Sequence, residues 1–225
     1  MKKIILSLVV LSICYGCRST SIIYDDTIIN RDNWVVEQQP GGSVIFENKQ
    51  IEIVDALGCT VWLKHKLEGA VKIEYDVIVI DEGGEHDRVS DLNSFWMASD
   101  PKNKNNFFKT SIERAGKFSN YHGLAQYYVG LGGHNNTKTR FRRYTGDGER
   151  PLLREHDLSD PRFLIPANKQ MHITLIAKGN DIKYLRDGEV IFEMQDSNPY
   201  TSGYFGFRTV NNHMRIKNIQ ISKIH

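Results

Sequence analysis

The feature that most restricts the fold of this chain is the alternation of apolar and polar residues in short stretches. In the stretch VKIEYDVIVID at 71–81, apolar residues occupy the odd positions from Ile73 to Val79, and charged residues occupy the even positions from Lys72 to Asp76. An extended strand places alternate side chains on opposite faces, so one face of this strand packs and the other is solvated. Similar stretches recur between Gly, Asn, Asp and Pro residues, and helical periodicity is nearly absent. The pattern predicts a mostly β fold.

This criterion predicts strands at 34–38, 43–48, 50–54, 59–67, 71–80, 91–98, 107–113, 125–131, 138–144, 171–177, 181–186, 189–194, 203–209 and 213–222. The Asp187-Gly188 pair between two of these ranges predicts a tight hairpin, because a primed turn needs residues that tolerate positive φ. No internal repeat and no linker rich in Pro or Ser interrupts the series. We therefore expect one β-sandwich domain over 18–225, built from two antiparallel sheets.

Composition excludes some classes of protein. The 225 residues carry a net charge of +2, with 40% hydrophobic and 25% charged residues, which is typical of a soluble globular protein. A protein that binds nucleic acid needs a broad basic face. The near-neutral net charge of this chain argues against such a face. We expect no nucleic-acid partner.

The first residues, MKKIILSLVVLSICYGC, indicate export. A basic pair precedes an apolar run that is short for a membrane span. Tyr15-Gly16-Cys17 resembles a bacterial lipobox, which implies a signal peptide over 1–17, lipidation of Cys17 and a membrane anchor, preferably on the periplasmic face; simple secretion and an uncleaved anchor stay open. Cleavage there would leave Cys59 as the one free thiol, so no internal disulfide is expected.

The closing run at 182–222 carries a resemblance to a known family. It joins a hairpin around Asp187-Gly188, the strand GYFGFR and a final strand IKNIQI, and it resembles the C-terminal half of the concanavalin A-like lectin and glucanase superfamily. Residues 59–224 are similar to a family of secreted domains of unknown function from bacterial glycan-utilisation clusters. The resemblance implies a jelly-roll sandwich whose concave sheet binds extended sugars. It leaves the activity open among hydrolases, lyases and non-catalytic binders.

The stretch YYVGLGGHNNTKTRFRRY at 127–144 concentrates cationic, amide and phenolic side chains. On a strand over 138–144, Arg140, Arg142 and Tyr144 share one face. Two same-face arginines stand roughly 7 Å apart and suit the carboxylate or sulfate of an acidic glycan. The alternative is a solvated edge strand whose arginines pair with acids such as Asp157 in the long loop over 145–170.

A polysaccharide lyase acting on a uronate needs a cation to neutralise the carboxylate, a base for the C5 proton and an acid for the leaving oxygen. Arg140 and Arg142 fit the first role, and His122 and Tyr128 fit the base and the acid. The alternatives are a backbone-bonded turn histidine and a core tyrosine. We expect β-elimination on a complex acidic polysaccharide, with a non-catalytic glycan-binding protein as the second hypothesis.

Other residues are assigned to substrate binding. Asn135 and Asn136 can bind sugar hydroxyls or shape a turn. Trp96 can stack on a sugar ring or pack in the core. His213 follows two asparagines as well, and the same two roles, sugar binding and turn formation, are open for it. The full expected set of substrate-binding residues is Asn135, Asn136, Tyr144, Trp96, Arg208 and His213.

A glycoside hydrolase would need two carboxylates beside the scissile bond. Glu74 and Asp76 share one strand face and form the best pair, although EYDVIV lacks the last acid of the superfamily's Glu-x-Asp-x-x-Glu pattern. Pairing with Lys72 is the alternative for these acids.

The loop DEGGEHDRVSD at 81–91 is rich in carboxylates, so a structural calcium ion stays possible, although a solvated acidic loop is the preferred interpretation. Cys59, His65 and His86 have no zinc-ligand spacing, and we expect no transition metal.

Overall fold

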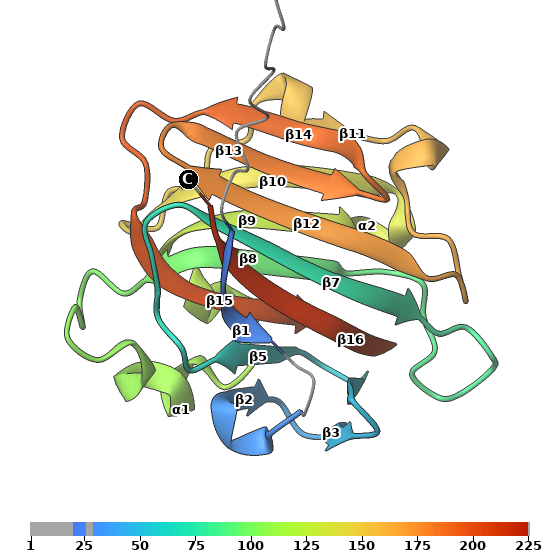
Figure 1. Ribbon diagram of the computed structural model, residues 1–225. Helices are drawn as coiled ribbons and strands as arrows, with labels where there is room; N and C mark the ends of the chain where they lie inside the picture. The colour runs from blue at the N-terminus through green and yellow to red at the C-terminus, as the bar shows by residue number, and fades with distance from the viewer. Residues whose placement is uncertain (1–19, 26–28, 225) are drawn as a thin grey trace, which may run out of the picture.

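The computed structural model describes residues 20–25 and 29–224 and consists of two facing β-sheets (Figure 1). The predicted signal peptide over 1–17 and Cys17 lie outside the described residues. Each sheet has eight strands in the described chain, and every pairing between these strands is antiparallel. The all-β jelly-roll sandwich expected from the sequence is confirmed.

The first sheet has the order β14-β13-β12-β7-β16-β4-β3, with β1 beside β16. Its strands are β1 Ser21–Asp25, β3 Ser43–Glu47, β4 Gln50–Asp55, β7 Val71–Val79, β12 Met171–Lys178, β13 Asp181–Arg186, β14 Glu189–Gln195 and β16 Asn212–Lys223. The second sheet has the order β11-β10-β9-β8-β15-β5-β2, with β6 beside β15. Its strands are β2 Trp34–Gln38, β5 Cys59–Leu63, β6 Leu67–Glu68, β8 Leu92–Ser99, β9 Ala125–Gly132, β10 Lys138–Thr145, β11 Asp157–Leu158 and β15 Ser202–Thr209.

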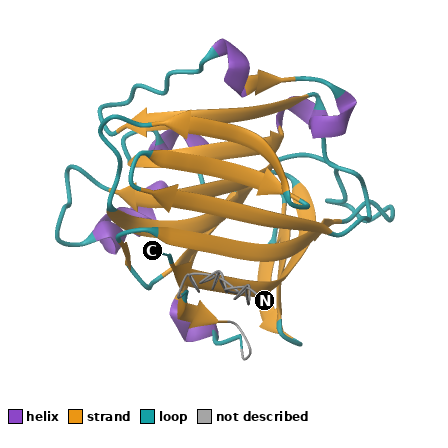
Figure 2. Ribbon diagram, turned by 45° about the horizontal axis from the view of Figure 1, so that its top comes forward, coloured by secondary structure: helices purple, strands orange, loops and turns teal. Residues whose placement is uncertain are grey.

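Short helical turns lie outside the two sheets (Figure 2). They are η1 Arg31–Asn33, η2 Phe107–Thr110, α1 Ser111–Arg114, η3 Phe118–Tyr121, α2 Gly133–Asn136, η4 Arg154–His156 and η5 Pro161–Phe163. No helix among the described residues is long and apolar enough to cross a membrane.

Most predicted strands agree with the structure, and 181–186 has the same bounds. The strand predicted at 107–113 is wrong, because η2 and α1 occupy this segment. Phe107 is buried while Ile112 is 91% exposed, so the segment covers a sheet instead of extending one. The sequence reasoning also missed β1 and the two-residue β11.

The main core lies between the sheets and follows from strand alternation. On β8, Phe95 points to the outer face of the second sheet and Trp96 points inward, where its ring stacks on Phe141 at a centroid distance of 5.8 Å. Trp96 is fully buried. The expected contact between Trp96 and a sugar is therefore wrong, because the β-sheet period directs its indole into the core.

Residues 107–124, which we call the cap, cover part of the outer face of the second sheet. A second apolar cluster fills the contact, and it comprises Trp62, Phe95, Ala98, Phe107, Tyr121, Leu124, Tyr128 and Tyr144. Gly206 allows the Trp62 ring to lie flat on the sheet, because a Cβ there would come within 2.6 Å of the ring.

A buried ion pair attaches the cap to the sheet. Arg114 in α1 contacts Glu37 of β2 at 2.6 Å, and both side chains are buried. Glu37 also accepts hydrogen bonds from the Tyr121 hydroxyl at 2.6 Å and from the Trp62 indole at 3.2 Å. Arg114 donates to the Phe107 carbonyl at 3.0 Å. Because each charge has several partners, the burial of this pair is well compensated.

We predict that Arg114→Ala lowers the free energy of unfolding by about 3–5 kcal/mol, because it leaves the buried Glu37 carboxylate without its counter-charge. Urea denaturation followed by tryptophan fluorescence measures the change. Lys109→Ala is the control: Lys109 is exposed on the same cap, and its loss should change stability by less than about 0.5 kcal/mol. A loss for Arg114→Ala no larger than that of the control would contradict this role.

Candidate functional site

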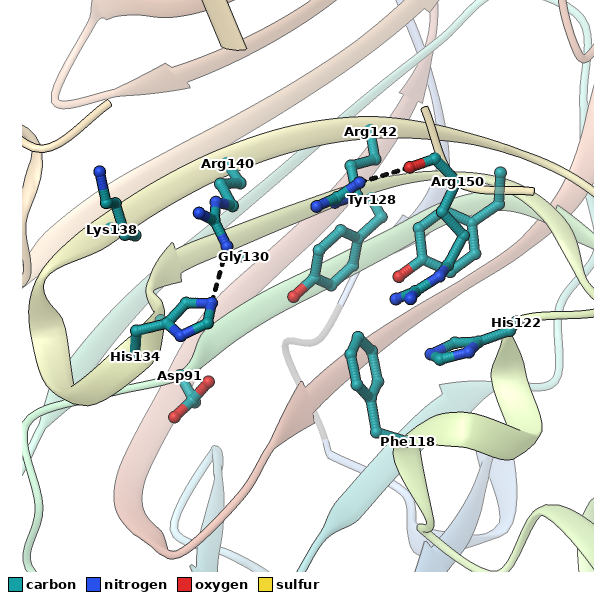
Figure 3. A pocket seen from close by; sticks show the side chains of 12 residues that line it. Asp91, Phe118, His122, Tyr128, Gly130, His134, Lys138, Arg140, Arg142 and Arg150 are labelled. Carbon is teal, nitrogen blue, oxygen red and sulfur yellow. Dashed lines mark hydrogen bonds between the residues drawn. The ribbon is translucent and has the colours of Figure 1, made fainter. Parts of the chain in front are cut away.

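A pocket of about 480 Å³ opens on the outer face of the second sheet, between the cap, β9, β10 and the turn at 133–136 (Figure 3). Its lining is dominated by cations and aromatic rings. The lining residues are Asp91, Phe118, His122, Tyr128, Gly130, Gly133, His134, Lys138, Arg140, Arg142, Tyr144 and Arg150. Five residues selected from the sequence are brought together here, namely His122, Tyr128, Arg140, Arg142 and Tyr144.

Strand β10 supplies most of the cations. Lys138, Arg140 and Arg142 lie on its outer face, and Phe141 between them is buried in the main core. The face assignment made from the sequence therefore agrees with the structure. In the neighbouring β9, Gly130 pairs with Arg140 and Tyr128 pairs with Arg142.

The arginines of the pocket differ in how far their charge is compensated. Arg140 donates to both carboxylate oxygens of Asp157, at 2.9 and 3.2 Å, which is the pairing that the edge-strand alternative predicted. Arg142 donates to the backbone carbonyl of Arg150. Neither Arg142 nor Arg150 forms an ion pair with any residue of the described chain. Two guanidinium charges therefore face the pocket without a counter-anion from the described residues.

Asp91 is the one carboxylate among the described residues that line this pocket. Its carboxylate is 2.7 Å from the Arg88 guanidinium and accepts a hydrogen bond from Ser90 at 2.6 Å. Because Arg88 neutralises Asp91, this acid offsets little of the positive charge of β10.

The turn at 133–136 places a histidine over the pocket. His134, Asn135 and Asn136 all adopt the left-handed conformation, with φ of 54°, 58° and 57°. The Arg140 guanidinium lies 2.7 Å from His134 Nε2. Since arginine only donates, His134 Nε2 accepts this hydrogen bond.

Asn135 and Asn136 form hydrogen bonds that stabilise the turn at 133–136. Asn136 donates to the Ile165 carbonyl and accepts from the Ile165 amide, both at 2.9 Å, so its amide holds the loop beside the turn. Asn135 accepts a hydrogen bond from Arg88 at 2.5 Å. Neither asparagine lines the pocket, so the structure favours their turn role over the expected contact with sugar hydroxyls.

His122 lies at the end of η3 with its ring among aromatic side chains. The ring centroid is 5.1 Å from Phe118 and 6.2 Å from Tyr144. Its Nε2 is buried without a hydrogen-bond partner in the described chain. Burial, followed by the positive charges of Arg150, Arg208 and Arg142, lowers the pKa of His122 below its usual value. The ring is therefore neutral at pH 7 and has a nitrogen available to accept a proton.

Tyr128 forms the floor of the pocket. Its hydroxyl donates to Asn93 at 3.4 Å, and burial raises the pKa of this phenol well above its usual value. A Cβ at Gly130 would come within 2.4 Å of this hydroxyl, so the glycine makes room for it. Tyr144 is fully buried beneath the pocket, and burial raises its pKa also. Both phenols are protonated at neutral pH.

His213 lies elsewhere. It belongs to β16 of the first sheet and contacts Asp87 at 2.8 Å and Glu52 at 2.7 Å. The expectation that His213 binds substrate with the other residues is wrong, because its strand belongs to the opposite sheet. Arg208 lies on β15 of the second sheet and lines an adjoining pocket.

The acids of the hydrolase alternative also lie on the first sheet. Tyr75 between them is in the core, so Glu74 and Asp76 point to the outer face of β7, away from the second sheet. Glu74 contacts Lys72 at 2.7 Å, and Asp76 contacts His172 at 2.8 Å. These contacts agree with the alternative that Glu74 and Asp76 pair with neighbouring basic residues.

Carboxylates of the acidic loop at 81–91 form hydrogen bonds and ion pairs with other residues of the protein. Asp87 accepts from the backbone amides of Glu82 and Gly84 and contacts His213, while Asp91 contacts Arg88. The described residues contain no group of three or more His, Cys, Asp or Glu side chains arranged to hold a metal ion. The structure thus gives no support for calcium in this loop.

Several lining residues were missed. Lys138 shares the face of Arg140 and Arg142, so the strand period alone could have added it. Phe118, Asp91 and Arg150 come from the cap and from loops, and no local pattern links them to β10. Only the folded arrangement brings them to the pocket.

We predict that the imidazole of His122 titrates below about 6.5, the usual histidine pKa, in an NMR pH titration. Arg150→Ala should raise this pKa, because it removes a neighbouring positive charge. Arg154→Ala removes an exposed arginine that does not line the pocket and should leave the titration unchanged. A pKa above the usual value would contradict the described environment.

Solved structures share this fold at low sequence identity. A Bacillus subtilis protein of unknown function with a galectin-like fold matches with a TM-score of 0.69 and 15% identity, covering 91% of this chain and 96% of that chain. A β-glucanase of Bacillus licheniformis gives 0.59 and 13%, with coverages of 90% and 98%. The carbohydrate-binding module CBM66 from Bacillus subtilis gives 0.55 and 14%, with coverages of 83% and 93%. These likenesses confirm the predicted jelly-roll fold.

No curated protein sequence is significantly similar to the chain. A family model described as a domain of unknown function, DUF6250, matches residues 53–219. Because this match covers well over half of the chain, the protein belongs to the DUF6250 family.

Proposed function

We propose that the protein acts on an acidic polysaccharide and that the pocket binds a uronate residue of this chain. The observation that carries the proposal is the pair of guanidinium groups, on Arg142 and Arg150, that lack a counter-anion in the described chain. Grouping like charges is unfavourable unless an anion joins them. A carboxylate between two guanidiniums would satisfy that requirement and gain charge-assisted hydrogen bonds.

The other pocket residues fit a sugar better than a simple anion. Phe118 and Tyr128 offer ring surfaces, and Lys138 and His134 add polar groups at the opposite end from His122 (Figure 3). Sugar rings combine apolar faces with hydroxyl edges, so such a mixture suits them. The fold is compatible with this ligand class, since one protein of similar fold is a carbohydrate-binding module and another a β-glucanase.

The proposed reaction is β-elimination. Neutral His122 takes the C5 proton of the uronate on its imidazole ring, while Arg142 and Arg150 stabilise the negative charge that builds up on the carboxylate. The C4–O bond then breaks as the C4–C5 double bond forms, and the leaving oxygen takes the hydroxyl proton of Tyr128. Return of the proton from His122 to the Tyr128 phenolate, through solvent, restores both groups.

Glycoside hydrolysis is less well supported. The usual mechanisms need two carboxylates at the scissile bond. The described lining of the pocket offers Asp91 alone, and Arg88 already binds it.

We predict that Arg142→Ala weakens binding of a uronate polysaccharide by about tenfold or more, the usual effect of losing a hydrogen bond to a charged group. Affinity is measured by titration calorimetry against polygalacturonate, alginate, hyaluronan and glucuronoxylan. Arg162→Ala, which removes an arginine exposed outside the pocket, is the matched control. If none of the acidic polymers binds, or if Arg142→Ala binds as tightly as the control, acidic-glycan recognition at this pocket is wrong.

We predict that His122→Ala keeps affinity but abolishes the ultraviolet absorbance of the unsaturated product. Because burial and nearby cations lower the pKa of His122, its neutral form persists in mild acid, so kcat/KM should fall only below about pH 6.5. New reducing ends without absorbance would indicate hydrolysis. Binding with no product of either kind would indicate a non-catalytic glycan-binding protein.

A further inference from the structure

A second pocket of about 420 Å³ adjoins the first on the same face of the sheet. Asp91, Phe118 and Tyr128 line both pockets. Because the two pockets share these three residues, they lie side by side on the sheet. A groove that joined them would run from β10 across β9 and β8 to β15.

The strand register shows how this groove crosses the sheet. Arg140 of β10 pairs with Gly130 of β9, Gly130 pairs with Asn93 of β8, and Asn93 pairs with Arg208 of β15. These four residues form one row at right angles to the strands. The row spans three strand spacings, or about 14 Å, between its two arginines. This length exceeds one sugar ring.

Gly130 and Asn93 form the middle of the row, and an arginine stands at each end. Gly130 has no side chain, and the amide of Asn93 accepts the Tyr128 hydroxyl at 3.4 Å. Arg208 closes the far end, where its guanidinium carbon lies 4.8 Å from the centre of the Phe118 ring and its Nη1 donates to the Gly116 carbonyl at 2.8 Å. Because the Arg208 side chain is 2% exposed, it supports the floor of the groove, and the exposed cation at this end is Lys117.

The second pocket has the chemistry of a further sugar site. Lys117 of the cap lines it with an exposed side chain. Leu57, which is 57% exposed, presents an apolar surface on the β4–β5 turn. A cation beside an apolar surface suits an acidic sugar, whose ring has both a charged group and an apolar face.

We infer that the two pockets form one groove that binds an internal stretch of a linear polyuronate, with successive sugars crossing β10, β9, β8 and β15. Lys117 and Leu57 form a second sugar subsite beside Arg208. The inference rests on the proposed function, since it assigns the second sugar to the same acidic glycan. The preferred ligand is a chain interior rather than a single terminal sugar.

The test is a series of binding titrations with disaccharides, tetrasaccharides and hexasaccharides prepared from polygalacturonate, alginate and hyaluronan. The hexasaccharide of at least one series should bind about tenfold more tightly than its disaccharide, because it gains the contact with Lys117. Lys117→Ala should reduce hexasaccharide affinity by a similar factor and leave disaccharide affinity unchanged. Leu57→Asp should have the same selective effect, because it places a negative charge in the subsite.

Lys109→Ala is the matched control, since Lys109 is exposed on the same cap but does not line either pocket. Equal affinity for all lengths, or unchanged affinity in both subsite variants, would overturn the second subsite. In that case Arg142→Ala would still weaken disaccharide binding, and the proposed function would stand. If no oligosaccharide of any series bound, the inference and the proposed function would both fail.

Discussion

The attachment of the cap to the second sheet is the contact on which the pocket depends. Without it, the outer face of this sheet would be an open surface with Trp62 and Phe95 exposed to water. The buried Glu37–Arg114 pair fixes the cap, and the apolar cluster beneath it removes these rings from solvent. The cap then contributes Phe118 and His122 as one wall of the pocket. A stability element thus also determines the shape of the site.

The electrostatics of the site follow from how unevenly its cations are compensated. Asp157 pairs with Arg140 at the edge of the sheet, and Arg88 pairs with Asp91 at the same end of the pocket, opposite His122 (Figure 3). The uncompensated charge is therefore concentrated at Arg142 and Arg150, near His122. The same charges help to keep this imidazole neutral, because a positive neighbour disfavours protonation. A single arrangement of charge thus provides both an anion site and a proton acceptor.

The sequence was sufficient to predict the sandwich and the outward face of β10, because strand alternation is a local property. It also predicted the hairpin at Asp187-Gly188, where both residues adopt positive φ. It was insufficient for the cap, because FFKTSIE alternates like a strand but has no neighbouring strand with which to pair. Trp96 and His213 were misassigned for another reason. Alternation gives the two faces of a strand, but only the complete sheet order determines which face meets the core and which sheet carries the pocket.

The central claim is that guanidinium groups recognise the carboxylate of a sugar. The most direct measurement compares the affinity of one uronate oligosaccharide with that of its carboxyl-reduced form at the same length and ionic strength. The two ligands share ring faces, linkages and most hydroxyls, so their difference isolates the charge. The account predicts that the acidic form binds more tightly and that the advantage shrinks as salt is added. Equal affinity for the two forms would contradict it.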